Sequence, residues 1–292
     1  MSLITIANDV LTVEVNTTGA VLSSIVKDGV EYLWQSSPDF WRRKDANLFP
    51  YVGRLTDGHY LYKGQYYELG IHGFATASEF EVTELTATSV QLTLKDSEQT
   101  RKSFPFAFVL HFRYHLEGNR VIKTTLVENI NDHEMCFGLG GHPGFNVPLN
   151  GEGEFTDWYM EFPEACSPER VLFNTTSYRM SGEVVPYELE GGRRIHLRHD
   201  LFDTDAVVLQ GMPRSVKLAS DKSKRSVTVD FSGMPFVGFW HTTCKPAPFV
   251  CVEPWVSLPS RHDRVEDLET QPNIVHLPTG ETYENVMTVT IE

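Results

Sequence analysis

The chain has 292 residues, of which 41% are hydrophobic and 22% are charged, and its formal net charge at pH 7 is −14. That apolar fraction supports a packed core, so the composition excludes an intrinsically disordered chain. An acidic surface repels phosphate backbones and anionic lipids, so neither nucleic acid nor a membrane surface is expected as a partner.

Cysteine usage and the N-terminal segment bear on the compartment. The four cysteines form no C-x-x-C pair, which argues against a zinc framework, and sparse cysteines fit a reducing environment. The first residues, MSLITIANDVLTVEV, lack the basic and apolar regions of a signal peptide. No apolar run approaches the roughly 20 residues that span a bilayer. We therefore expect a soluble, cytoplasmic protein.

Alternation of apolar and polar residues is the dominant pattern, and it predicts strands with one buried face. The clearest case is FPFAFVLHFRYHL at 104–116, where a large apolar side chain occupies every second position. The other predicted strands are LTVEV (11–15), AVLSSIV (20–26), EFEVTEL (79–85), SVQLTLK (89–95), RVIKTTLVE (120–128), SVTVDF (226–231) and VMTVTIE (286–292). Asp28-Gly29 lies between two such runs and favours a type I′ hairpin turn.

Helical signals are weak. No long stretch shows a period of 3.6 residues, and Ser167, Pro168 and Glu169 indicate one short helical turn with proline at its first position. No internal repeat, linker or low-complexity tract divides the chain. The pattern therefore predicts one large antiparallel β-sandwich.

Two polar residues stand beside glycines in the first third of the chain. Arg54 lies in LFPYVGRLTDG, and His72 lies in ELGIHGFA. Each is a weak signal alone, because an arginine at a strand end most often forms a surface ion pair.

The segment GLGGHPGFNVP, residues 138–148, places His142 among glycines and a proline after an apolar-rich stretch. Glycines allow close approach of the backbone to a ligand, and an imidazole can exchange a proton near neutral pH. The alternative is a tight turn that carries an incidental histidine. Because loops carry function more often than their share of residues, His142 is a candidate catalytic group.

Acidic residues near the end of the chain give the next candidates. Asp203 and Asp205 precede an apolar run in DLFDTDAVVL and could simply form a turn. Glu253 follows the apolar run of FVCVEPW, and a buried carboxylate there needs either a partner or a catalytic task. Burial would raise its pKa toward the range of a general base. Trp255 would offer a flat face to a sugar ring.

Several other kinds of site are not predicted. His196 and His199 have no evident third ligand, so we expect no metal there. Neither a G-x-S-x-G nucleophile elbow nor a nucleotide-binding glycine motif occurs.

Taken in order, NLFPYVGRL, IHGFA, GGHPGFNVP, FDTDAVVL and FVCVEPW resemble the aldose 1-epimerase (galactose mutarotase-like) family. The resemblance covers nearly the whole chain and is nearest to a shorter branch often associated with lactose or galactose utilisation. It implies a β-supersandwich that spans residues 1–292 as one domain.

The resemblance also implies a mechanism and its residues. His142 and Glu253 correspond to the family's catalytic pair, which opens and closes a hexose ring by acid–base chemistry without a metal or other cofactor. Arg54 and His72 correspond to substrate-binding residues, and Asp205 corresponds to the substrate aspartate, with Asp203 as the alternative. We also expect the glycines around His142 to let the sugar lie close to the backbone, with Phe145 and Asn146 in the pocket wall.

Two other functions remain open at this point. A hexose-6-phosphate 1-epimerase would need a phosphate site, for which the run Trp41-Arg42-Arg43-Lys44 is the local basic cluster. A non-catalytic sugar-binding protein would not need both His142 and Glu253. The sequence decides neither the physiological aldose nor the oligomeric state.

Overall fold

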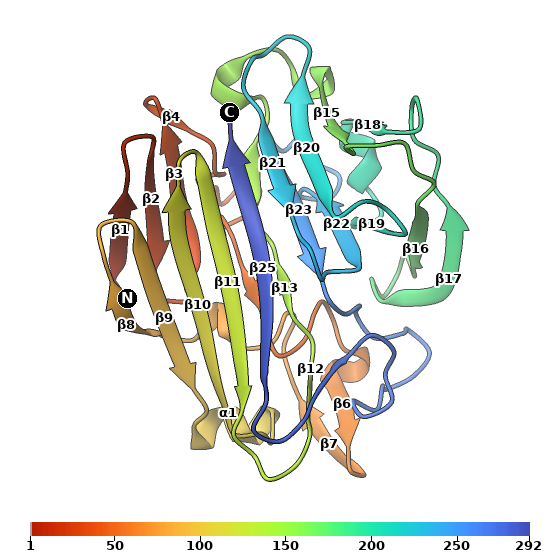
Figure 1. Ribbon diagram of the computed structural model, residues 1–292. Coiled ribbons are helices and arrows are strands. Elements are labelled where there is room, and N and C mark those ends of the chain that lie inside the picture. The colour runs from red at the N-terminus through yellow and green to blue at the C-terminus, as the bar shows by residue number, and fades with distance from the viewer. Residues whose placement is uncertain (1) are drawn as a thin grey trace.

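A computed structural model describes residues 2–292, and it confirms the predicted all-β class (Figure 1). The largest sheet has nine strands in the order β18-β15-β20-β21-β25-β11-β10-β9-β8. In that order its strands are Arg194–His196, Trp158–Glu161, Ser215–Ser220, Val227–Asp230, Thr282–Ile291, Arg120–Asn129, Phe108–Glu117, Ser89–Lys95 and Glu81–Leu85.

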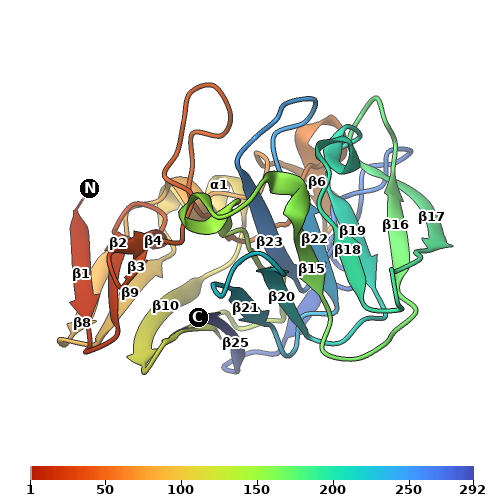
Figure 2. The ribbon, with the colours of Figure 1, turned by 90° about the horizontal axis from the view of Figure 1, so that it is seen from above.

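A second sheet of eight strands carries the segments that matter for function, in the order β17-β16-β19-β22-β23-β13-β5, with β14 also paired to β23. Its strands are Met180–Pro186, Glu169–Phe173, Val207–Gln210, Phe236–Trp240, Phe249–Trp255, Gly140–Gly141 and Asn47–Leu48, with β14 at Gly144–Asn146. Seen from above, β22 and β23 form a layer facing β20, β21 and β25 (Figure 2). Apolar side chains from both layers meet in one continuous core.

Three smaller sheets complete the fold. A four-stranded sheet takes the order β1-β2-β3-β4, and two pairs are β12-β24 and β6-β7. Their strands are Leu3–Ala7, Leu11–Asn16, Val21–Lys27, Val30–Glu31, Met135–Phe137, Val275–Leu277, His59–Tyr62 and Gln65–Glu68. Short 3-10 helices lie at Thr56–Gly58, Ala75–Ala77, Leu149–Gly151, Phe155–Asp157 and His199–Phe202.

The alternation of apolar and polar residues predicted the central strands of the large sheet correctly. β10 runs from Phe108 to Glu117 and pairs with β11 in a register that sets Tyr114 opposite Lys123. The predicted strand at 104–116 starts four residues too early, although Phe104 and Phe106 are buried.

The helical prediction at residues 167–169 is wrong. Glu169 is the first residue of β16, where its backbone pairs with β17 and β19. Tertiary pairing therefore overrides the local helix signal. The α-helix within residues 2–292 is α1, Glu98–Ser103, capped by Ser97. Its six residues are too few to show a helical period in the sequence. No helix in this part of the chain is both long and apolar enough to span a bilayer.

Candidate active site

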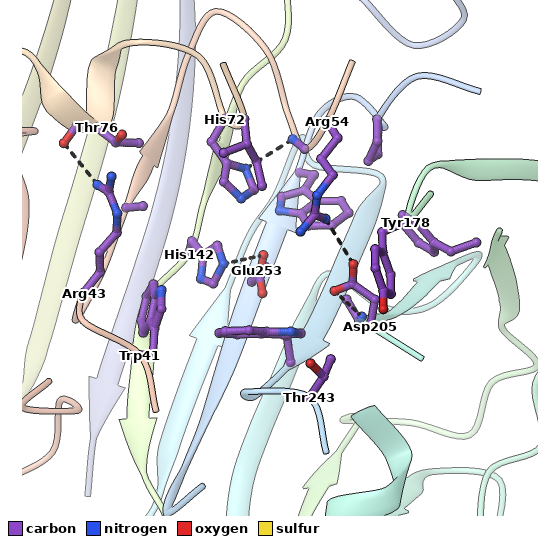
Figure 3. Close-up of a pocket in the computed structure, with 18 residues that line it drawn as sticks. Trp41, Arg43, Arg54, His72, Thr76, His142, Tyr178, Asp205, Thr243 and Glu253 are labelled. Carbon is purple, nitrogen blue, oxygen red and sulfur yellow. Dashed lines mark hydrogen bonds and ion pairs between the residues drawn. The ribbon is translucent and has the colours of Figure 1, made fainter. Parts of the chain in front are cut away.

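One cavity of about 390 Å³ opens beside Glu253 and Trp255, toward the end of β23, and gathers residues from distant parts of the chain (Figure 3). Its size suits a small ligand. All five sequence-predicted site residues line it, namely Arg54, His72, His142, Asp205 and Glu253. The alternative, Asp203, is exposed and lies outside the lining, so the structure favours Asp205.

Glu253 is presented by β23, whose residues are all buried. The opposite position on β22 is Gly238, where a Cβ would lie 3.2 Å from the ring of Trp255 and 3.4 Å from Cβ of Glu253. A glycine therefore leaves room for both side chains. Glu253 is only 2% exposed. Burial, assisted by the nearby negative charge of Asp205, raises its pKa well above the ordinary value.

His142 follows β13 and meets Glu253 directly (Figure 3), with Nε2 of the imidazole 3.2 Å from Oε2 of the carboxyl group. Burial and the neighbouring His72 lower the pKa of His142 well below its usual value. Both groups are thus pushed toward their neutral forms. A neutral pair holds as many protons as an imidazolium and a carboxylate, so one proton can sit on either partner.

The glycines before His142 have a different role from the one we expected. A Cβ on Gly138 would lie 2.3 Å from Oγ of Ser257, and one on Gly140 would lie 2.7 Å from the ring of Trp255. They let the loop pack closely against other protein segments, including β23, rather than against a ligand. Phe145 and Asn146, which we expected in the pocket wall, do not line the cavity. Phe145 is fully buried, and the Asn146 amide donates to the backbone carbonyls of residues 31 and 33.

Aromatic rings hold the His142 imidazole in place. Trp41 stacks on it, with ring centroids 4.8 Å apart and an angle of 22° between the planes. Trp240 approaches edge-on at 5.7 Å. In the sequence, Trp41 stands out only as the start of a basic run, and no local pattern marks Trp240. Each lies far from His142 in sequence, so no local pattern could pair them.

His72 also packs against His142, with 5.5 Å between the centroids of the two imidazole rings. Its backbone φ is +64°, and its Nδ1 accepts a hydrogen bond from the Gly53 N–H at 3.2 Å. This acceptor role leaves the ring proton on Nε2. Burial and nearby arginines lower the pKa of His72 to about 3, so it is a neutral donor at physiological pH.

Arg54 and Asp205 form an ion pair along another wall, with 3.1 Å between Nη1 and Oδ2 (Figure 3). Burial raises the pKa of Asp205, and the guanidinium opposes that rise. Tyr178, which the sequence did not indicate, lies under the guanidinium at 5.5 Å from its ring centroid. The two charged groups therefore present fixed donors and acceptors toward the cavity.

A buried polar network lies behind the His142 loop. The Asp45 carboxylate accepts a hydrogen bond from the Leu22 N–H at 3.0 Å, and the backbone N–H groups of Ala46 and His142 lie close enough to lower its pKa. Lys123, 4% exposed, donates to the side chain of Asn47. Burial lowers the pKa of Lys123 to about 8, against the favourable charge of Asp45. No local pattern in the sequence predicted this network.

Donor atoms that could approach a metal ion also occur in the cavity. The donor atoms of His142, Cys251 and Glu253 lie within 4.8 Å of one another. Burial raises the pKa of the Cys251 thiol well above its usual value. The direct contact of His142 with Glu253 suits proton transfer between these two groups.

Comparison with known proteins adds an independent line of evidence. The family model for aldose 1-epimerase matches residues 2–290. The plasmid protein LacX of Lactococcus lactis subsp. lactis is 32% identical over 99% of both chains. A galactose mutarotase related enzyme from Lactobacillus acidophilus has a TM-score of 0.93 at 34% identity, covering 100% of this chain and 97% of that one. A galactose mutarotase-like protein from Lactobacillus casei ATCC 334 also has a TM-score of 0.93, at 30% identity and full coverage of both chains.

Proposed function

Because the chain belongs to the aldose 1-epimerase family, we propose that it interconverts the α and β anomers of a free hexose such as galactose or glucose. Membership makes the protein an epimerase that acts on carbohydrates, within the isomerase class. The observation that carries the proposal is the buried contact of 3.2 Å between His142 and Glu253 inside a cavity of sugar size. The choice of hexose and the residue roles below belong to the proposal.

Ring opening needs a base for the C1 hydroxyl and an acid for the ring oxygen. In the ionic form of the pair, the Glu253 carboxylate takes the hydroxyl proton while the His142 imidazolium protonates the ring oxygen. The electron pair of the C1–O bond leaves with the ring oxygen, and C1 becomes an aldehyde. Glu253 is then a neutral acid and His142 a neutral imidazole.

Ring closure on the other face reverses these steps. After rotation about the C1–C2 bond, His142 takes the proton from the former ring hydroxyl, and Glu253 returns its proton to the carbonyl oxygen. Burial favours the neutral pair, which is its form while the sugar is open. The site thereby favours the protonation states that Glu253 and His142 have while the sugar ring is open.

The remaining wall residues would hold the sugar while C1 rotates. The His72 Nε2–H would donate to a sugar oxygen, and the Arg54–Asp205 pair would bind neighbouring hydroxyl groups. Trp255 also lines the cavity, and its buried indole N–H has no partner within residues 2–292. The chemistry consists of proton transfers, so it requires no metal, nucleotide or covalent intermediate. A cytoplasmic location stays a prediction from the sequence.

A hexose 6-phosphate is the second candidate substrate, because Arg43 of the basic run lines the cavity. Its guanidinium donates to the Thr76 carbonyl at 3.3 Å. Lys44 points elsewhere, to the Ser23 carbonyl and the side chain of Gln35. A phosphate site needs two or three converging charges, and Arg54 is already paired with Asp205, so we favour an uncharged hexose. A non-catalytic sugar-binding protein would have no need for the buried acid–base pair.

The test is the optical rotation of freshly dissolved α-D-glucose and α-D-galactose, with the wild type, E253Q, H142A and the exposed control E190Q. We expect wild type and E190Q to speed equilibration, and E253Q and H142A to lose about 10²–10⁴-fold of that rate. Full activity in E253Q would refute the assigned roles. Activity with hexose 6-phosphates alone would support the second candidate, and binding without turnover would support a sugar-binding protein.

A further inference from the structure

A second group of chemically reactive side chains lies outside the cavity, on the two-stranded sheet formed by β12 and β24. Cys136 is paired directly opposite His276. Glu134 lies two residues before Cys136, so both side chains project from the same side of the extended chain. Donor atoms of these three residues lie within 4.8 Å of one another.

Hydrogen bonds through one nitrogen of His276 already hold these three side chains together. Sγ of Cys136 lies 3.4 Å from Nδ1 of His276, and the same nitrogen lies 2.8 Å from Oε1 of Glu134. Ligand atoms around one tetrahedral ion, each about 2.0–2.3 Å from it, are necessarily separated by a little over 3 Å. Small side-chain shifts would therefore let all three reach a common ion.

Charge around the thiol also favours a cation. Burial and the nearby carboxylates of Glu134, Glu269 and Asp267 raise the pKa of the Cys136 thiol, and the charge of Lys63 opposes them. The same carboxylates attract a cation, which displaces the thiol proton when it binds. The His276 and Glu134 side chains are 40% and 54% exposed, so an ion can enter from solvent. Cys136 itself is buried, which shields the sulfur from bulk water.

We propose that Glu134, Cys136 and His276 form a zinc-binding site, with water as the fourth ligand. One thiolate, one imidazole and one carboxylate suit Zn²⁺ and disfavour Mg²⁺ or Ca²⁺, which take oxygen ligands. Binding displaces the thiol proton to solvent and involves no oxidation. The ion would tie β24 to β12, the strand that leads into the His142 loop. This site is independent of the proposed catalytic function.

The experiment uses the untagged full chain, reduced and freed of metal, with Co²⁺ as the spectroscopic probe. Tetrahedral thiolate-bound Co²⁺ shows a near-ultraviolet charge-transfer band and intense visible bands, which Zn²⁺ should abolish by competition. The variants are C136A, H276N and E134Q. The matched controls are C251A, which removes the thiol near the catalytic pair, and C166A.

We expect one equivalent of Co²⁺ to give the thiolate band in wild type, C251A and C166A. The band should disappear in C136A, and H276N and E134Q should weaken binding at least about 10-fold. H276N changes a half-exposed side chain, so it stays informative even if C136A fails to fold. No thiolate band in wild type, a band that survives C136A, or one lost only in C251A would each overturn the proposal. Rotation assays on the same samples judge the catalytic proposal separately.

Discussion

Replacing Lys123 with methionine tests the buried network behind the His142 loop. Lys123 and Asp45 are 4% and 3% exposed, so neither charge is solvated by water. Methionine keeps most of the apolar stem and removes the ammonium group, whose nitrogen lies 4.9 Å from the centroid of the Phe112 ring. Asp45 must then either remain ionised without its partner or take up a proton when the chain folds.

Protonation limits how much this substitution can destabilise the fold. The ordinary pKa of the Asp45 carboxyl group is 3.8, and burial raises it in the folded chain. Protonating a group of that pKa costs about 2 kcal/mol at pH 5.5 and about 5 kcal/mol at pH 7.5. The protonation cost at pH 7.5 agrees with the roughly 3–5 kcal/mol of stability lost when one partner of a buried charge pair is removed.

The sign of the pH dependence follows from the raised pKa. A group whose pKa is raised by folding contributes its full stability below the unfolded value and loses it as pH rises through the folded value. Lys123 opposes the rise in the pKa of Asp45 in the wild type, so its removal raises the folded pKa of Asp45 further. The deficit of K123M should therefore grow with pH between pH 5.5 and 7.5, by up to about 1.4 kcal/mol per unit. In the wild type, the pKa of Lys123 is about 8, so over most of that range it is charged both folded and unfolded and adds little slope.

Urea unfolding of wild type, K123M and D45N/K123M at pH 5.5, 6.5 and 7.5 measures these differences. The double variant carries an amide that cannot titrate, so its deficit should be nearly independent of pH. If K123M shows the same deficit at all three pH values, removal of Lys123 does not change the protonation of Asp45, and the reasoning is refuted.

Three further predictions concern the turn after His72 and the cavity. G73A should lower the free energy of unfolding in urea by about 3 kcal/mol or more, because φ is +74° and a Cβ would lie 2.2 Å from the Phe49 carbonyl oxygen. The control G64A, at φ +77° with open space around it, should lower that free energy by only about 1–2 kcal/mol. W41A should lower kcat more than W41F, which keeps an aromatic ring against the catalytic imidazole, and equal kcat values would contradict the stacking role. D205N should raise KM and move the acidic limb of the kcat/KM profile to lower pH, because the charge of Asp205 raises the pKa of Glu253; an unmoved limb would show that this charge does not act on Glu253.

Local patterns in the sequence determined the β class and pointed to Glu253. Strand alternation has a period of two residues, so β10 could be predicted from its own side chains. Glu253 stood out because a carboxyl group that ends an apolar run needs a partner or a reaction. His142 stood out for its glycines, although those glycines serve packing against Trp255 and Ser257.

Only the tertiary structure decided which side chains meet. Lys123 occupies an inward-facing position of β11, opposite Tyr114, and its carboxylate partner comes from a segment that precedes β5. The choice of Asp205 over Asp203 depended on the turn at φ +88° that aims Asp205 at Arg54. Local periodicity sets which face a residue takes. The cross-strand register and the packing of distant loops set its partner, because each contact joins segments that share no local pattern.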